Sequence, residues 1–345
     1  MSEDFLLDVQ IVPATSHDYD EVMSISGGID CGLDYLPVSY HKWLADPQRR
    51  MFLAKFKKQV VSKVGFVSLL VVDGGEAAVA QKLRVALWMR GRGIVRLIQK
   101  HLSDTLCPRY REVTKVRLAT SEHVPPTKLS KYQLIHSKVV VSVILPHDQL
   151  DHAVKLLKHR VQSAYGKQPL DALTPEEVLS LFENSRTAER LLPKGLLIQG
   201  WLPLSTHKSN LELLIQRGIV WFHSEHCEKT SDCESTTKSG DTSVTISSGF
   251  LSLGTPPISV PLGDGMHRFD IDLFGTDPVS AKKHILHQLI KGVQLLPLGA
   301  GVVCIFYAET SLHDELTNFC QGLTKFHFYK EQNVLEQDIK VLARH

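Results

Sequence analysis

The sequence has no long hydrophobic run, little net charge and few cysteines. No apolar stretch approaches the roughly 20 residues that cross a bilayer, and the acidic start MSEDFLLDVQIV lacks the features of a secretory leader. A net charge of +2 gives no overall field for nucleic acid or a membrane surface. The 6 cysteines are scattered, without CxxC pairs or a disulfide framework. We therefore expect a cytoplasmic protein in a reducing compartment, without nucleic-acid or membrane partners.

Residues 83–98 form the most informative stretch of the chain. It begins as the end of an apolar strand, turns through RGRG at 90–93, and continues as an amphipathic helix with Ile94, Leu97 and Ile98 on one face. Such a turn directs several backbone N–H groups, and the positive end of the helix dipole, toward one point. Two glycines allow close approach and two arginines add positive charge. The stretch predicts an anion site, which we interpret as a phosphate site.

Known phosphate motifs differ in what they require of this turn. The Rossmann fingerprint needs three glycines as G-x-G-x-x-G, and the P-loop needs Lys followed by Ser or Thr; neither is present. The turn resembles the pyrophosphate loop [QR]-x-x-G-x-[GA] of the GNAT superfamily of acetyl-CoA-dependent N-acetyltransferases, although its last position, normally a small residue, is a valine. A plain surface turn is the alternative. The resemblance implies acetyl-CoA contacts at nine residues: Leu83, Arg84, Val85, Arg90, Gly91, Arg92, Gly93, Ile94 and Val95.

The order of elements in the first half supports this resemblance. Hydrophobic periodicity and turn residues predict strands over 5–14, 50–56, 61–72, 76–87, 113–120 and 137–145, and helices over 17–26, 38–46, 91–105 and 127–134. The resulting order, β-α-α-β-β-β-α-β-α-β, is similar to that of the GNAT fold, a mixed and mostly antiparallel sheet flanked by helices. We therefore predict an α/β catalytic GNAT domain over residues 1–147.

The second half repeats a similar order in diverged form. Residues 148–194 are polar and predict a helical connector, and 227–243 are polar and low in complexity. Strands near 195–202, 219–224, 244–253, 267–274, 300–308 and 325–330 alternate with helices from Ser209, at 278–292 and at 311–321. Where the first half has its phosphate turn, this half reads DLFGTDPVSAKK, with an aspartate that would repel pyrophosphate. We predict a degenerate GNAT-like domain over 195–345 that does not bind the coenzyme.

Acyl transfer from a thioester to an amine requires an oxyanion donor, a proton acceptor and a proton donor for the thiolate. Backbone groups at 83–85 would serve the coenzyme if the strand at 113–120 diverges from them. The resemblance implies that Tyr132 is the catalytic acid for coenzyme A, a half-buried helix aromatic being the alternative. Pro125 stands where the superfamily often has an asparagine. Cys31 has no visible activating partner, which favours direct attack by the amine.

The general base stays open at this stage. Glu76, Asp34, Asp73 and Glu122 are carboxylates in or near plausible loops, and a water chain to a backbone carbonyl would also serve.

Several segments resemble a narrower family. SISGGIDCGLDYLP, KLRVALWMRGRGI, LSKYQLI, IDLFGTD and VLEQDI are similar to the histidine N-acetyltransferase family of fish and other vertebrates, over nearly the whole chain. This resemblance implies acetyl-CoA and free L-histidine as substrates and N-acetylhistidine as product. Histidine needs an acidic or phenolic group for its imidazole and a cation for its carboxylate. From position alone we select Asp34, Tyr35 and Tyr40 for the first role and Arg117 for the second.

Other functions are compatible with the same sequence features. The alternatives are acetylation of another small amine or a peptide N-terminus, and a non-catalytic acyl-CoA-binding scaffold. His223, His226, Cys227 and Cys233 are possible zinc ligands, but their spacing fits no common structural zinc site. We therefore predict no metal.

Overall fold

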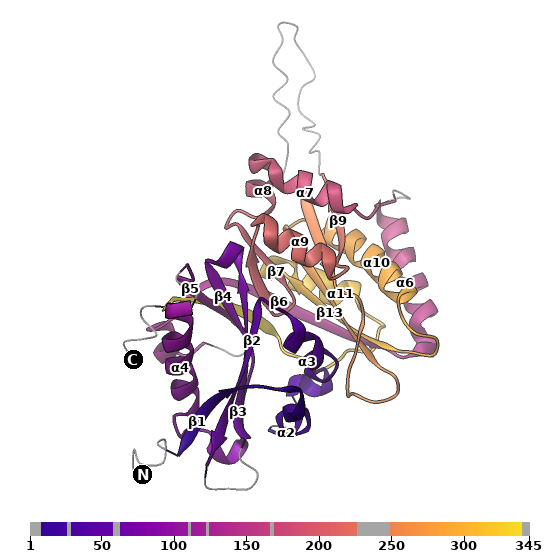
Figure 1. The fold of residues 1–345 in the computed structure, drawn as a ribbon. Helices are drawn as coiled ribbons and strands as arrows, with labels where there is room; N and C mark the ends of the chain where they lie inside the picture. The colour runs from indigo at the N-terminus through magenta and orange to yellow at the C-terminus, as the bar shows by residue number, and fades with distance from the viewer. Residues whose placement is uncertain are drawn as a thin grey trace, which may run out of the picture.

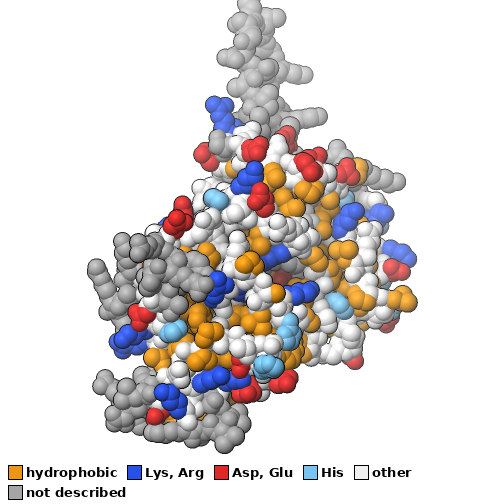
Figure 2. Space-filling view, in the orientation of Figure 1, with side chains coloured by type: hydrophobic (Ala, Val, Ile, Leu, Met, Phe, Trp, Pro, Cys, Tyr) orange, Lys and Arg blue, Asp and Glu red, His pale blue; other side chains and the backbone are white. Residues whose placement is uncertain are grey.

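The computed structural model describes residues 8–25, 29–57, 63–109, 112–121, 124–165, 169–225 and 249–339. Both halves of the chain contribute to one long mixed sheet with the strand order β1-β2-β3-β4-β5-β14-β6-β13-β12-β10-β9, and β11 pairs with β12 at its side (Figure 1). Lys and Arg side chains are interspersed with Asp and Glu over the face drawn in Figure 2. No helix in the described ranges is both long and apolar enough to cross a bilayer.

The first half follows the predicted order of elements. Its bounds are β1 Val9–Pro13, α2 Tyr19–Ser24, α3 Leu36–Ala45, β2 Arg49–Phe56, β3 Lys63–Val72, β4 Ala77–Val85, α4 Ile94–Arg109, β5 Lys115–Thr120, α5 Pro126–Leu129 and β6 Gln133–Leu145. The helix predicted over 127–134 was wrong at its end, because residues from Gln133 onward pair with β14 as part of β6. The predicted fold class, a GNAT-like α/β sheet flanked by helices, is confirmed.

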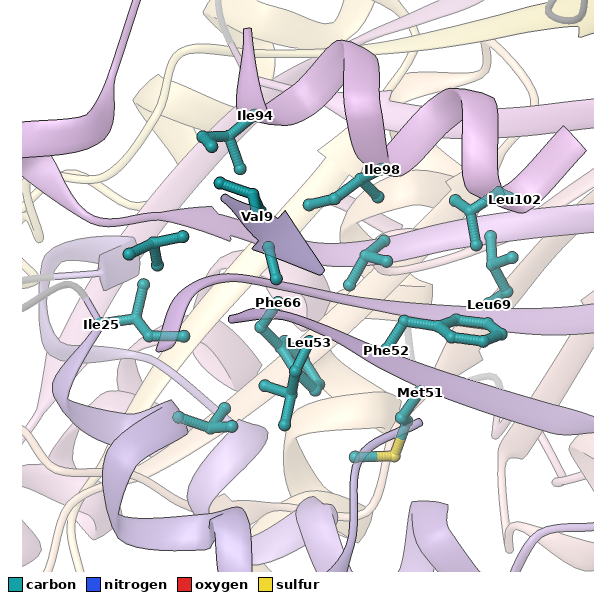
Figure 3. Packing of buried hydrophobic residues seen from close by; sticks show 14 of the residues in the cluster. Val9, Ile25, Met51, Phe52, Leu53, Phe66, Leu69, Ile94, Ile98 and Leu102 are labelled. Atoms are coloured by element: carbon teal, nitrogen blue, oxygen red, sulfur yellow. The ribbon is translucent and has the colours of Figure 1, made fainter. Parts of the chain in front are cut away.

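Helix α4 is fixed to the sheet by its apolar face. Ile94, Ile98 and Leu102 recur every fourth residue and lie buried against the sheet (Figure 3). Gly65 of β3 lets the helix approach closely, since a Cβ there would lie 3.1 Å from both Ile94 and Ile98. This packing sets the position of the turn that precedes α4.

The second half adds helices and strands at the other end of the sheet. Its bounds are α6 Leu150–Tyr165, α7 Pro175–Glu183, α8 Ser185–Leu191, β7 Leu196–Gln199, β8 Leu202–Ser205, α9 Lys208–Gln216, β9 Val220–Ser224, β10 Phe250–Gly254, β11 Ile258–Ser259, β12 His267–Phe274, α10 Pro278–Gln294, β13 Val302–Ala308, α11 His313–Phe319 and β14 Glu331–Asp338. The strand predicted over 195–202 is instead the separate hairpin β7–β8, which turns at Gly200 and Trp201. Residues 227–243 lie outside the described ranges.

The last strand joins the two halves. β14 lies between β5 and β6 and pairs antiparallel with both, so a strand from the end of the chain completes the sheet of the first half. The sequence placed this strand too early, at 325–330, where Lys325 forms only an isolated bridge to Val143. The boundaries at 147 and 194 stay a prediction, but the sheet runs across both halves without a break.

Candidate active site

Strands β4 and β5 run parallel and then separate. They pair from Ala77 to Ala80 against Lys115 to Leu118, and no further pairing joins them although β4 continues to Val85. At Lys82 the backbone φ is +55°, and the register between β3 and β4 shifts at this bulge. The end of β4 therefore has backbone N–H and C=O groups that form no hydrogen bonds with β5. The sequence analysis named this divergence as the condition for binding the coenzyme at residues 83–85.

A cavity of about 760 Å³ lies where the strands separate. It is lined by residues 80–85 of β4, by residues 118–121 at the end of β5, by Arg90 in the turn before α4, and by Val95 and Gln99 of α4. The segment around α5 and two side chains of the second half, Trp201 and Tyr329, also line it. The cavity has the size of a small-molecule site.

The predicted coenzyme residues fall into three groups. Leu83, Arg84, Val85, Arg90 and Val95 line the cavity. The turn that contains Arg92 has its two glycines, Gly91 and Gly93, at φ of +73° and +82°, which is backbone that side chains disfavour. The Ile94 side chain is only 1% exposed and packs in the core, so it faces away from the cavity.

Tyr132 lines the cavity just after α5. Its side chain is buried, and its hydroxyl accepts a hydrogen bond of 3.0 Å from Nε2 of Gln99 on α4. Burial raises the pKa of Tyr132 above its usual value, because the charged phenolate loses solvation. The phenol therefore keeps its proton at neutral pH and is able to donate it.

Of the residues selected for the substrate, Tyr35 lines the cavity, whereas Asp34 does not line it and instead contacts two residues that do. The Lys82 ammonium sits 3.8 Å from the centre of the Tyr35 ring. Asp34 pairs with Lys82 at 3.0 Å and with Arg84 at 2.5 Å. Burial opposes the charge of Asp34, but the two cations outweigh it and hold the pKa of this carboxyl below its usual value. Asp34 thus supports two cavity residues.

The structure does not bring Tyr40 or Arg117 to the cavity. Tyr40 is fully buried in the core between α3 and the sheet, and its hydroxyl donates to the Thr15 carbonyl at 2.8 Å. Arg117 pairs with Asp73 at 2.6 Å and with Glu336 at 2.7 Å. Sequence position alone does not show which side of a helix or strand a side chain occupies, so these two residues were selected although they face away from the cavity.

The candidate bases are likewise placed elsewhere. Asp73 is held by Arg117 and by the Asn210 amide at 2.6 Å, and neither Asp73 nor Glu76 lines the cavity. Glu122 lies outside the described residues.

The sequence analysis missed several lining residues as site residues, among them Asp30, Lys82, Trp201 and Tyr329. Asp30 precedes Cys31 and Gly32 in a turn with three successive positive φ values of 52°, 55° and 89°. Such backbone costs about 1–2 kcal/mol for each residue other than glycine, and strain of this kind clusters at functional sites. The glycine after Asp30 and Cys31 was the available sequence signal for this turn.

The second half lacks the equivalent opening. β12 and β13 pair from His267 to Asp272 against Val302 to Tyr307, close to the ends of both strands. Asp277 caps the following helix, α10, and its carboxylate accepts from the Ser280 N–H at 2.7 Å. A carboxylate therefore occupies the helix terminus where a phosphate would bind, and the absence of coenzyme binding in this half stays a prediction.

Comparison with known proteins agrees with this arrangement. Residues 166–309 match the model of the family described as "Histidine N-acetyltransferase, C-terminal". Over 96% of its length the chain is 32% identical to "Probable N-acetyltransferase 16" of Homo sapiens, covering 86% of that protein, and 31% identical to "Histidine N-acetyltransferase" of Xenopus tropicalis, covering 95% of it. The chain belongs to the histidine N-acetyltransferase family. It is an acyltransferase enzyme with a GNAT fold.

Solved structures with similar architecture support the tandem fold of this histidine N-acetyltransferase family member. A tandem GNAT protein from the clavulanic acid biosynthesis pathway aligns with a TM-score of 0.51 and 13% identity, over 96% of this chain and 98% of that one. A putative acetyltransferase from Pyrococcus horikoshii gives a TM-score of 0.51 and 14% identity, over 96% and 89%. At these identities the likeness concerns the fold.

The described residues offer no cluster of metal ligands. No group of three His, Cys, Asp or Glu side chains in these ranges could hold a metal ion. His223 lies on β9, whereas His226, Cys227 and Cys233 fall outside the described ranges.

The core position of Tyr40 leads to a prediction for this histidine N-acetyltransferase family member. Tyr40→Phe should lower the free energy of unfolding by about 1 kcal/mol, because it removes one buried hydrogen bond to Thr15 and keeps the ring. The KM for the amine should stay unchanged. Denaturant unfolding measures the change in stability, and steady-state kinetics measure the KM for the amine. A raised KM with unchanged stability would indicate that Tyr40 contacts the substrate.

Proposed function

We propose that the protein transfers the acetyl group of acetyl-CoA to the α-amine of free L-histidine, giving N-acetylhistidine and coenzyme A. The observation that carries this proposal is the cavity where β4 and β5 separate, beside the glycine-rich start of α4. Support for histidine comes from the name of the Xenopus tropicalis relative.

The residues around the cavity fit a polyanionic thioester substrate. Five lining side chains are cationic, namely Lys82, Arg84, Arg90, Lys128 and Lys131. The first turn of α4 contains no acidic residue, so the positive end of the helix dipole is not neutralised there. We assign the pyrophosphate to the turn 90–93 and the pantetheine amides to backbone groups of residues 83–85.

Direct attack by the amine is the mechanism that these residues favour. The Tyr132 phenol would give its proton to the thiolate as the C–S bond breaks and the N–C bond forms, and the proton that the attacking nitrogen loses would pass to water, from which the phenol is reprotonated. Burial, and the Asp30 charge next to it, raise the pKa of Cys31. Its thiol thus stays protonated and is a poor nucleophile, which argues against an acetylated enzyme intermediate.

Thiol release from acetyl-CoA by the purified protein tests this proposal. The panel contains free amino acids, histamine, polyamines and short peptides, and mass spectrometry identifies the acetylated product. Release mainly with histidine, together with N-acetylhistidine, is expected. Release with peptides or polyamines instead would keep the enzyme class and reject the substrate.

A charge reversal at Arg90 tests the assignment of the coenzyme. Arg90→Glu should weaken binding of coenzyme A about tenfold or more, because a carboxylate would replace a cation at the phosphates. Lys100→Glu is the matched control, since it reverses an exposed charge on α4 that does not line the cavity. Calorimetry measures both affinities. Equal effects of the two variants would contradict a local role of Arg90.

A further inference from the structure

The cavity lining contains one carboxylate side chain, that of Asp30, among the described residues. Among the described residues that line it, Asp30 is the only Asp or Glu, and it lies in a lining that is otherwise rich in Lys and Arg. Its side chain is 17% exposed, so it is accessible to a ligand. A substrate group that donates hydrogen bonds therefore has one strong acceptor side chain here.

The contacts of Asp30 leave its carboxylate with acceptor capacity. Its Oδ2 accepts from the Lys82 ammonium and lies 3.9 Å from Nη1 of Arg268 on β12. Its Oδ1 accepts from the Tyr329 hydroxyl at 3.4 Å, which is longer than the usual 2.7–2.8 Å for such a bond. Both cations thus lie at Oδ2, while Oδ1 is only weakly engaged.

Besides Tyr132, three aromatic side chains line the same cavity as Asp30. The rings of Trp201 and Tyr329 meet edge to face, with centroids 5.9 Å apart and an interplanar angle of 86°. Trp201 also packs edge to face on Tyr307, 6.0 Å away, which fixes it from behind. Tyr35 lies below the Lys82 ammonium. Flat walls beside a carboxylate suit a planar ring that carries an N–H donor.

We propose that Asp30, Tyr35, Trp201 and Tyr329 form the subsite that recognises the imidazole ring of the substrate. The Asp30 carboxylate accepts the ring N–H, and the ring lies against the aromatic side chains. The subsite rests on the proposed histidine acetylation. It also gives the second half a role in specificity, since Trp201 belongs to the β7–β8 turn and Tyr329 precedes β14.

Methylated substrates test the subsite without altering the protein. The two N-methyl isomers of histidine each block a different ring nitrogen, so an Asp30 carboxylate that accepts from one nitrogen distinguishes them. The expected kcat/KM values differ by about tenfold or more between the isomers, as for loss of one hydrogen bond to a charged group. Equal values for the two isomers, whether high or low, would overturn the proposal.

Variants provide a second measurement. Asp30→Asn should lower kcat/KM for histidine about tenfold or more, while coenzyme A affinity, measured by calorimetry, stays within about twofold. Asp314→Asn is the matched control, because it makes the same change at an exposed carboxylate that does not line the cavity; it should leave the kinetics with histidine unchanged. Unchanged histidine kinetics in Asp30→Asn would overturn the subsite.

The two failures are distinguishable. If the unaltered protein makes no N-acetylhistidine, the proposed function fails. If it makes N-acetylhistidine but treats both methyl isomers alike, only the imidazole subsite fails. The isomer comparison decides the matter even where Asp30→Asn does not fold, since that variant leaves Lys82 and Arg268 without one of their partners.

Discussion

Replacing Tyr132 with phenylalanine is expected to lower kcat about 100-fold or more. The change keeps the ring in its buried position and removes the one hydroxyl that we assign to protonation of the leaving thiolate. General acid catalysis by a positioned side chain contributes about 10²–10⁴-fold, which sets this magnitude. Affinity for coenzyme A should stay within about twofold, since the lost group acts on the departing sulfur.

The raised pKa of Tyr132 adds a dependence on pH. Because burial favours the protonated phenol, the activity of the unaltered enzyme should not fall on the basic side until above the usual tyrosine pKa of about 10. Steady-state kinetics of both proteins over a pH series, with Tyr40→Phe as a control for loss of a hydroxyl elsewhere, provide the comparison. An unchanged kcat in Tyr132→Phe would assign the proton to solvent instead.

The turn and the helix that we propose as the phosphate site could be predicted, because residues close together in the sequence determine both. The glycines at 91 and 93 both adopt positive φ, and the spacing of Ile94, Ile98 and Leu102 gives α4 its buried face. The same holds for Asp277 at the start of α10, where a capping aspartate followed by proline specifies the helix start.

What the sequence did not reveal depends on contacts between distant residues. β14 pairs with β5 across more than 200 residues of chain, as between Asn333 and Thr120, and no local pattern indicates this partner. Asp30, Trp201 and Tyr329 likewise meet only because the second half folds against the first. Tyr40 illustrates the opposite error. It is close to the site residues in sequence, but its side of α3 packs into the core.

A buried ion pair joins the two halves below the turn that carries Trp201. Lys138 of β6 and Asp272 of β12 are both almost fully buried, with Nζ and Oδ1 3.8 Å apart. Oδ2 of Asp272 accepts the Gly200 N–H at 2.6 Å, and the Gln332 amide donates to the Gly200 carbonyl at 2.5 Å. Burial raises the pKa of Asp272 to about 7 even with Lys138 beside it, so this carboxylate depends strongly on its partner.

Lys138→Met should therefore lower the free energy of unfolding at pH 8 by about 3–5 kcal/mol, because it leaves a buried charge without its cation. Burial raises the folded-state pKa of Asp272 to about 7 beside Lys138, and loss of the cation raises it further above the unfolded value of about 3.9, so the variant should regain stability as the pH falls toward 4. Denaturant unfolding at several pH values measures this trend.

The double variant Lys138→Met/Asp272→Asn removes the charge and should recover much of the loss without the pH trend. If the single variant loses less than about 1 kcal/mol, or if the double variant shows the same pH trend, the assignment of the effect to Asp272 is wrong.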